Sequence, residues 1–365
     1  MTFYICMLFL IAIIMMPNYS KNIDKNYKKI SFYSVTIILI IIVGFRNINV
    51  GMGDTANLYI PEFKRIINYN YKFIIENYKD PAFYMISKIL LDIFKNIRVL
   101  LIIYSSIYII PVMYLIYKKS PYPILSILMF ISLNFFGTAF SGIRHCCACG
   151  IIILSFFYLE KRNLKKFIIS IIIASLFHIT SIIFIIAYPM YNILSKSNKK
   201  TYIKLLILTI IIFLLNKIYG KYIIANVLNI IINNFNLSRF EIYAQNNFSS
   251  LNNNLFYMNF IMFALVIFFK NKNVNNLKLS LYLTVQIIGL ILLSFTTSLG
   301  ELYRLAYYFI QFSIILVPNY ITFLNNKSTN KIIRISISII LIIYFLFFSA
   351  KNTSIIPYQF LGGEF

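Results

Sequence analysis

The run "FIISIIIASLFHITSIIFIIAYPMYNIL", residues 167–194, decides the fold, because its 28 residues are almost all apolar. A bilayer crossing needs roughly 20 apolar residues. The run therefore predicts either one long tilted membrane helix or two short helices that meet at His178. His178 is one of only 2 histidines in the chain, and burying a titratable ring among Ile, Leu and Phe costs free energy unless the ring is used. It is either a structural histidine bonded to a backbone carbonyl or a reactive group.

The composition is that of a membrane protein. Of 365 residues, 60% are hydrophobic and 12% are charged, and the mean hydropathy is +0.80, whereas soluble chains average about 45–50% apolar and about 25% charged residues. The formal net charge is +24, but the lysines fall in short loops between apolar runs, as the positive-inside bias of membrane proteins requires. We therefore expect a polytopic all-α integral membrane protein that binds the lipid bilayer and no nucleic acid.

The distribution of basic loops predicts the topology. Loops 160–166 and 196–200 are both basic and should face the cytoplasm, so the run between them must enter the membrane and return. The same reasoning applies to 121–159, with a turn near "SGIRHCC". The apolar runs that we expect to span are 1–16, 31–45, 99–117, 121–138, 143–159, 167–194 (crossing twice), 202–219, 253–269, 279–297, 303–324 and 332–350.

These runs predict about twelve transmembrane helices in a single transmembrane domain, residues 1–365, with both termini outside. Two larger outer-face segments remain, 46–97 and 220–252. The first contains an amphipathic stretch, 82–95, which we expect to be an interfacial helix, with a re-entrant segment as the alternative. His178 would then lie near the outer tip of a helical hairpin.

Ionisable residues from separate parts of the chain gather on this outer face. Arginines at outer helix ends run against the positive-inside bias, and Arg144 and Arg304 adjoin apolar runs with almost no loop. A guanidinium there suits a bidentate anionic oxygen donor such as a diphosphate. Asp54 follows two glycines in "GMGDT", which predicts a turn; it is a candidate base or sugar-hydroxyl acceptor, or the acceptor of an Asx turn. The outer-face residues assigned to the site are Arg46, Asp54, Asp80, Arg144, Arg239, Glu301 and Arg304.

The stretch "HCCAC", residues 145–149, carries side chains that can bind metals. Neighbours at i and i+1 do not share a helix face, however, and no second group of ligands occurs elsewhere. Small residues that let helices approach closely explain the cluster better. We expect no metal and no cofactor.

Read in order, six stretches resemble the EpsG-like family of Wzy-type polysaccharide polymerases, over nearly the whole chain from residue 45. The matching stretches are "GFRNINVGMGDTANLY", "DPAFYMISKIL", "SGIRHCCACGIII", "ASLFHITSIIF", "YRLAYYF" and the terminal "IPYQF". The chain departs from the family pattern at a few positions. His145 stands where the family usually has Gln, Ala82 replaces a Gly, and Cys146, Cys147 and Cys149 occupy a helix that is normally Ala-rich.

The resemblance implies a glycosyltransferase of O-antigen, capsule or exopolysaccharide synthesis, acting at the outer face of a bacterial inner or plasma membrane. It would move the growing glycan from undecaprenyl diphosphate to a hydroxyl of the next lipid-linked oligosaccharide unit. A separate chain-length regulator is an expected partner by analogy.

For this chemistry we assign Arg144 and Arg304, with Arg46 in support, to the diphosphate. His178 is the candidate general base, or alternatively a second diphosphate donor as imidazolium. Asp54 would orient the histidine or bind the acceptor sugar, and Asp80, Arg239 and Glu301 would bind substrate. A lipid-linked glycan ligase shares the donor and the geometry and stays open as an alternative, and a lipid-linked oligosaccharide flippase is a weaker one because the charges crowd one face.

Overall fold

The computed structural model describes residues 1–19, 24–235, 253–268, 277–296, 302–324 and 326–360, and these contain helices and no strand. Within these described residues, five helices are long and apolar enough to cross a membrane: Lys25–Gly44, Ile97–Lys119, Ile143–Glu160, Lys199–Gly220 and Lys327–Asn352. The all-α fold is therefore confirmed. The count of about twelve spans stays a prediction, because the other apolar helices of the described residues are shorter than a full crossing.

The chain divides into two compact units, Met1–Tyr188 with Ile314–Phe365, and Pro189–Ser313. The prediction of a single domain stays a prediction. The first unit contains α1 (Thr2–Met15), η1 (Met16–Tyr19), α2 (Lys25–Gly44), η2 (Thr55–Tyr59), α3 (Ile60–Ile66), α4 (Tyr71–Asn77), α5 (Pro81–Phe94), α6 (Ile97–Lys119), α7 (Pro123–Ser132), α8 (Phe135–Thr138), α9 (Ile143–Glu160), α10 (Leu164–Phe177), η3 (Ile179–Ile186), α18 (Lys327–Tyr344), η6 (Phe345–Ser349) and α19 (Ala350–Asn352). The second contains α12 (Lys199–Phe235), α14 (Asn254–Phe268), α15 (Leu277–Ser294) and α16 (Tyr303–Ile310), while α11 (Ala187–Leu194) and α17 (Ser313–Ile321) cross the boundary.

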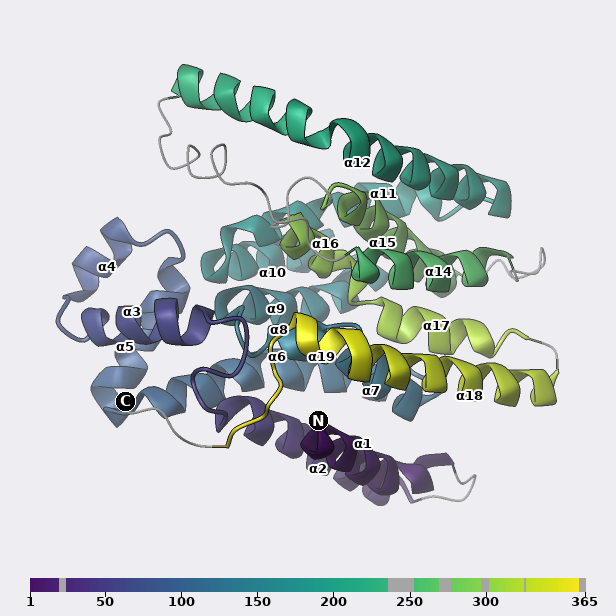
Figure 1. Ribbon diagram of the computed structural model, residues 1–365, viewed down its shortest axis with the longest axis horizontal. Helices are drawn as coiled ribbons and strands as arrows, with labels where there is room; N and C mark the ends of the chain where they lie inside the picture. Colours follow the sequence, from purple (N-terminus) through teal and green to yellow (C-terminus); the bar gives the residue numbers. More distant parts are fainter. Residues whose placement is uncertain (20–23, 236–252, 269–276, 297–301, 325, 361–365) are drawn as a thin grey trace. The chain divides into compact units, whose positions relative to one another are not determined.

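The core of the first unit is a row of four helices, in which α2 packs on α6, α6 on α9 and α9 on α10 (Figure 1). Glycines allow the closest approaches. A Cβ at Gly44 would lie 2.8 Å from the Ile102 side chain of α6, and one at Gly150 of α9 would lie 2.2 Å from the Ile107 backbone oxygen. The backbones of α6 and α9 therefore touch, as small residues permit in membrane helix pairs.

Replacing Gly150 by alanine is expected to lower the stability of the protein in detergent by about 1–3 kcal/mol, because the helices must separate to admit the methyl group. The control is Gly142→Ala, whose Cβ would meet its nearest neighbour, Thr138 Cγ2, at 3.4 Å. The measurement is the temperature at which half of each purified variant stays soluble. An unchanged midpoint for Gly150→Ala would contradict the close contact.

The run 167–194 is confirmed as a helical hairpin broken at His178. Asn163 caps α10 by accepting a hydrogen bond from the Lys166 amide, and α10 ends at Phe177. His178 is extended, with φ −156° and ψ 109°, and η3 begins directly after it and packs back on α10. The alternative of one long tilted helix is wrong.

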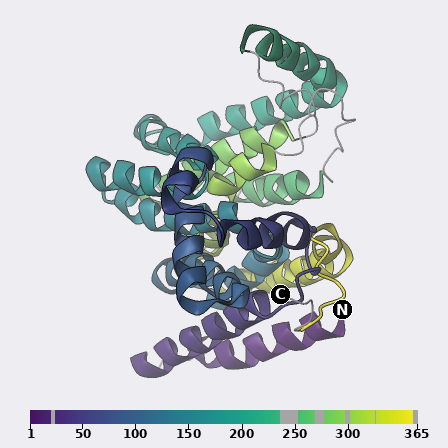
Figure 2. The same cartoon turned by 90° about the vertical axis from the view of Figure 1, so that its left-hand side faces the viewer.

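The predicted outer segment 46–97 folds into η2 and the helices α3, α4 and α5, which Figure 1 shows at one end of the first unit and Figure 2 shows facing the viewer. Asn70 caps α4. α5 begins at Pro81 and ends at Phe94, and its C-cap residue, Lys95, adopts the left-handed conformation with φ 49°. The helix expected at 82–95 is confirmed as α5, and its interfacial position stays a prediction. Of the second predicted segment, 220–252, residues up to Phe235 continue α12, and 236–252 lie outside the described residues.

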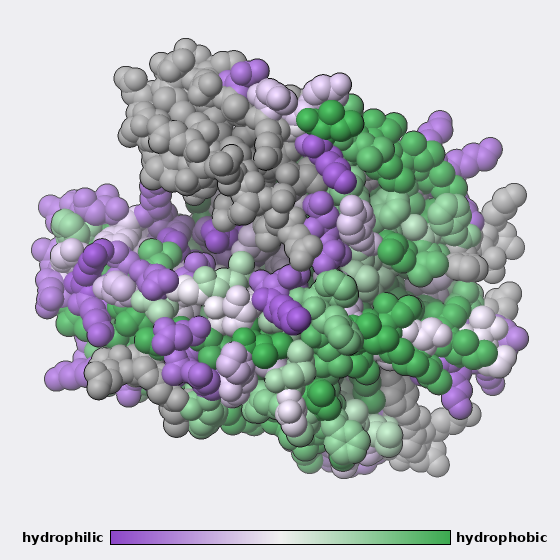
Figure 3. Space-filling model, in the orientation of Figure 1, coloured by the Kyte–Doolittle hydropathy of each residue, from purple (hydrophilic) through white to green (hydrophobic). Residues whose placement is uncertain are grey.

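The helices of the first unit expose large apolar side chains, as a lipid solvent allows. On α18 the exposed fractions of Ile332 and Ile339 are 63% and 52%. In Figure 3 hydrophobic residues gather over α18 and hydrophilic residues gather over α3 to α5. This separation agrees with a membrane-embedded body and a polar end.

In the second unit α15 is the central helix and packs on α12, α14 and α16. Gly289 of α15 lies against α16, where an added Cβ would meet the Ile310 side chain at 2.5 Å. The buried amide of Gln286 donates to the Asn259 side chain of α14 at 3.1 Å. This close packing positions α16, which carries Arg304.

Candidate functional site

Three of the stretches singled out in the sequence meet at one point in the first unit. Asp80 is the N-cap of α5, Arg144 lies in the first turn of α9, and His178 is the extended residue between α10 and η3. Arg144 Nη1 donates to Asp80 Oδ2 at 2.8 Å, and His178 Nδ1 lies 3.7 Å from the same oxygen. The Asp80 carboxylate therefore contacts both Arg144, the candidate diphosphate-binding residue, and His178, the candidate base.

Asp80 is the centre of this cluster. Its side chain is 5% exposed, and its second oxygen, Oδ1, accepts the backbone N–H of Ile179 at 3.2 Å. Burial acts to raise the pKa of Asp80, but the interaction with His178 and the charge of Arg144 outweigh burial and leave the pKa below its ordinary value. Asp80 is therefore an anion at neutral pH, and it ties the first residue of η3 to the start of α5.

The lowered pKa of Asp80 predicts a pH dependence of stability. The ionised form binds its partners only in the folded state, so its stabilisation is present above about pH 4 and is lost as pH falls through the lowered pKa. At pH 7 the unfolding free energy of Asp80→Asn should be about 1–3 kcal/mol lower than that of wild type, because buried donors lose their anion. Its melting temperature should be lower for the same reason. The two melting temperatures should converge on acidification below about pH 4. Parallel curves from pH 7 to pH 3 would contradict the assignment.

Arg144 is held between aromatic rings. Its guanidinium carbon lies 5.6 Å from the Tyr59 ring centroid and 5.7 Å from that of Tyr84, and cation–π contacts of this kind orient an arginine. The side chain keeps 23% exposure, and its Nε has no hydrogen-bond partner in the described part of the chain. The exposed part of the Arg144 side chain can therefore bind an anionic ligand, whereas its Nε is buried.

The other histidine lies beside His178. His145 follows Arg144 on α9 and is 2% exposed, and the two imidazole centroids are 5.8 Å apart with the rings nearly perpendicular. His145 Nε2 contacts Cys149 Sγ at 3.7 Å, one helical turn later. Cys146, Cys147 and Cys149 are buried in α9, and the described residues hold no group of three or more His, Cys, Asp or Glu placed to bind a metal ion.

Arg46 forms a separate, structural cluster. It is 1% exposed, its Nη1 donates to the Val43 carbonyl, and its Nη2 donates to Thr55 Oγ1 at 2.9 Å and to the Phe140 carbonyl at 2.6 Å. Burial, and secondarily Arg98, lowers its pKa to about 10, so Arg46 stays charged at neutral pH. Its terminal nitrogens are occupied by the chain itself, which favours a role in holding the loop after α2 over the predicted role as a diphosphate ligand.

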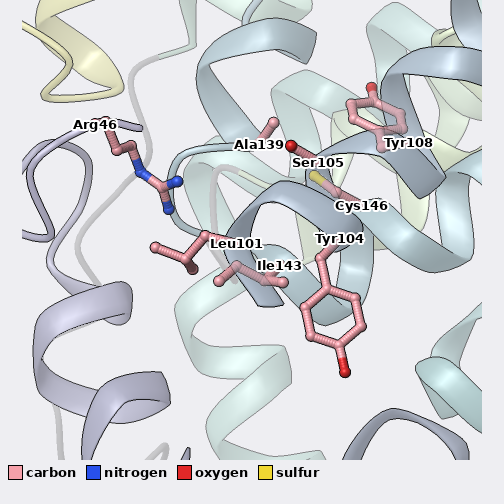
Figure 4. Close-up of a pocket in the computed structure, with 8 residues that line it drawn as sticks. All are labelled: Arg46, Leu101, Tyr104, Ser105, Tyr108, Ala139, Ile143 and Cys146. Atoms are coloured by element: carbon pink, nitrogen blue, oxygen red, sulfur yellow. The ribbon is translucent and has the colours of Figure 1, made fainter. Parts of the chain in front are cut away.

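A small cavity adjoins Arg46, and Figure 4 shows the guanidinium directed toward it. Its volume is about 10 Å³, room for about one water molecule. Its walls are Arg46, Leu101, Tyr104, Ser105, Tyr108, Ala139, Ile143 and Cys146. A sugar or a diphosphate cannot enter a space of this size, so the cavity belongs to the packing of the core.

The turn predicted at "GMGDT" is confirmed. Gly51 and Gly53 have φ of +120° and +85°, and a Cβ on Gly51 would lie 2.6 Å from Ser141 Oγ. The turn packs the loop onto the residues before α9 and ends at Asp54, which precedes η2. The carboxylate beside His178 is thus Asp80, while the role of Asp54 as base, as sugar ligand or in orienting the histidine stays a prediction.

The remaining candidate residues lie outside the first unit or outside the described residues. Arg304 lies in α16 of the second unit, with its Nε 3.4 Å from Tyr303 Oη. Arg239 and Glu301 lie outside the described residues. Their assignment to substrate stays a prediction.

Sequence reasoning missed the two tyrosines of the cluster. Tyr84 follows Asp80 by four residues, and this i, i+4 spacing on a helix puts both on one face. Tyr59 ends the first family-like stretch, and its hydroxyl also lies 3.5 Å from the Arg144 amide nitrogen. Helical spacing could have found Tyr84, whereas nothing local links Tyr59 to Arg144.

Comparison with known proteins gives one match that covers most of the chain. Residues 29–360 match the model of the EpsG family, and this range contains every family-like stretch quoted from the sequence. No curated protein and no solved structure matches the chain significantly. The matched range includes Asp80, Arg144 and His178.

Proposed function

The chain belongs to the EpsG family, a family of Wzy-like polysaccharide polymerases, and from this premise we propose that it polymerises undecaprenyl-diphosphate-linked oligosaccharide units. The reaction takes place at the outer face of a bacterial inner or plasma membrane. The growing glycan leaves its lipid diphosphate and joins a hydroxyl of the next lipid-linked unit. The product is an O-antigen, capsule or exopolysaccharide chain.

The observation that carries this proposal is the contact of Arg144 and His178 with a single buried carboxylate, Asp80. Glycosyl transfer from a diphosphate needs a cation for the departing anion and an acceptor for the hydroxyl proton. Arg144 supplies the cation and His178 the proton acceptor. Asp80 holds both in place from between them.

The transfer step balances without any further reactant. The anomeric C–O bond to the diphosphate breaks, and a new C–O bond forms to the acceptor oxygen. The hydroxyl proton passes to His178, and the bonding pair leaves with the diphosphate, which Arg144 binds through its uncommitted donors. Because Nδ1 of His178 lies 3.7 Å from Asp80 Oδ2, Nε2 is the nitrogen that receives the proton, and the charge of Asp80 then stabilises the imidazolium.

Asp80 is in this scheme a positioning residue. It takes one terminal nitrogen of Arg144, so the diphosphate binds the rest of the fork, and Tyr59 and Tyr84 keep the guanidinium plane fixed. Fixed donors act on developing charge without the cost of reorganisation. Arg304 remains our second candidate ligand for the diphosphate.

The experiment is genetic and uses the whole chain in its own membrane. The gene is deleted, the strain is complemented with wild type, and lipid-linked and free glycans are separated by length. A polymerase predicts single repeat units on the lipid carrier in the deletion strain and a full ladder after complementation. Polymer stranded on the lipid carrier in the deletion strain would show a ligase instead. Units confined to the cytoplasmic leaflet would show a flippase.

A further inference from the structure

A groove on the first unit, between α2 and α6, lies outside everything the proposed function uses. The two helices are antiparallel, because Gly44 at the end of α2 adjoins Ile102 near the start of α6, while the Phe32 and Tyr117 rings meet at the other end, 5.1 Å apart. The groove has a volume of about 520 Å³. Its walls include Tyr33, Ile37 and Ile40 of α2 and Ile110, Met113 and Tyr114 of α6.

The length of the groove along α2 is close to the thickness of the hydrocarbon layer of one leaflet. It extends along α2 from Lys29 to Ile40, which at the rise of an α-helix is about 17 Å. Half of a hydrocarbon core of about 30 Å is about 15 Å. An acyl chain that enters at the lysine end therefore reaches the bilayer midplane where the groove ends.

The mouth of the groove is basic. Lys28 Nζ and Lys118 Nζ each lie 5.5 Å from the centroid of the same ring, Tyr117, and Lys29 and Lys118 line the opening. Within the described residues no carboxylate forms an ion pair with these three lysines. Ammonium groups gathered around one ring repel each other unless an anion lies among them.

We propose that this groove is a binding site for an anionic phospholipid of the leaflet at its lysine end. The headgroup phosphate lies among Lys28, Lys29 and Lys118, and one acyl chain lies along the apolar walls. Basic pockets between membrane helices at the headgroup level bind anionic lipids for this electrostatic reason. The bound phospholipid would contact both α2 and α6 and so stabilise the packing of the two helices.

The lipid carrier of the proposed reaction is not the occupant. Tyr104 on α6 donates to the Phe83 carbonyl of α5, beside Asp80, and so marks the level of the reaction cluster. Lys118 lies fourteen residues farther along the same helix, a distance of about 21 Å. A diphosphate bound at Arg144 therefore cannot reach this mouth, and the groove is too short for a long polyprenyl chain.

The test is a lipid-binding measurement on the purified full-length protein and does not depend on polymerisation. The protein is placed in phosphatidylcholine nanodiscs with increasing phosphatidylglycerol, and the lipids retained after gentle release are identified by native mass spectrometry. The variant Lys29→Gln/Lys118→Gln should bind the retained phosphatidylglycerol about 30-fold more weakly, which corresponds to about 1 kcal/mol for each lysine. The control Lys64→Gln/Lys72→Gln, on α3 and α4, makes the same charge change and should bind like wild type.

A second variant separates the groove from its charge. Ile37 is 56% exposed, so Ile37→Trp is tolerated by the fold but fills the groove, and it should also reduce phosphatidylglycerol retention. Equal retention by wild type and the lysine variant would overturn the proposal, as would equal retention of phosphatidylcholine and phosphatidylglycerol. Displacement of phosphatidylglycerol by equimolar undecaprenyl phosphate would assign the groove to the carrier and would likewise overturn it.

Discussion

Replacing Arg144 by alanine is expected to slow polymerisation by about 10²–10³-fold, because a fixed donor to the departing diphosphate is lost. The lipid-linked repeat unit should accumulate, and the glycan ladder should shrink to its first rungs. The structural reason is that the Arg144 side chain keeps 23% exposure while Asp80 and the rings of Tyr59 and Tyr84 hold the guanidinium in place. The measurement is the initial rate of chain extension in membranes that contain equal amounts of inserted protein.

Arg144→Lys sharpens the test. A lysine keeps the positive charge but loses the planar fork that binds two oxygens and that stacks on Tyr59 and Tyr84. We expect Arg144→Lys to recover less than a tenth of the rate that Arg144→Ala loses. A tenfold difference in rate corresponds to about 1.4 kcal/mol of lost transition-state binding. Recovery to the wild-type rate would show that only a diffuse charge is needed there.

Arg65→Ala is the matched control for both variants. Arg65 lies in α3 of the segment 46–97, is 63% exposed and pairs with Glu62 at 2.7 Å, and a surface pair of this kind contributes little to stability. Its polymerisation rate should equal that of wild type. A native rate for Arg144→Ala, with insertion verified, would remove Arg144 from the reaction.

The helical hairpin could be predicted from the sequence because its causes are local. Basic loops on both sides of 167–194 force the chain to return, and His178 is the one strongly polar ring in the run. The turn at Gly51 and Gly53 is also local, since both glycines adopt the positive φ that other residues avoid. Local patterns of charge and glycine thus determine where the chain turns.

The contacts of the candidate site could be predicted only in part. The family-like stretches contain Asp80, Arg144 and His178, but which carboxylate meets the histidine depends on how α5 packs against α10, which no local pattern specifies. From the sequence we assign Asp54 to orient the histidine and Asp80 to bind substrate, whereas the packing places Asp80 beside the histidine. Arg46 shows the same limit, because its bond to the Phe140 carbonyl joins residues 94 positions apart.

Replacing His178 by alanine is expected to lower the rate of extension by about 10²–10⁴-fold, the usual contribution of a general base. The amount of inserted protein and the binding of the lipid-linked unit should change little, because Asp80 still pairs with Arg144. His145→Gln is the matched control: it alters the other histidine, 5.8 Å away between ring centroids, to the residue usual in the family, and it should keep most of the activity.

Rescue by small bases distinguishes the two roles open to His178. If the side chain accepts the hydroxyl proton, added imidazole should restore part of the activity of His178→Ala, and the restored rate should rise with the basicity of substituted imidazoles. If it instead donates to the diphosphate as imidazolium, His178→Lys should retain activity and imidazole basicity should not matter. The geometry favours the first outcome, because Asp80 contacts Nδ1 and leaves Nε2 to take a proton. A His178→Ala protein that extends glycan at the native rate without added imidazole would exclude both roles.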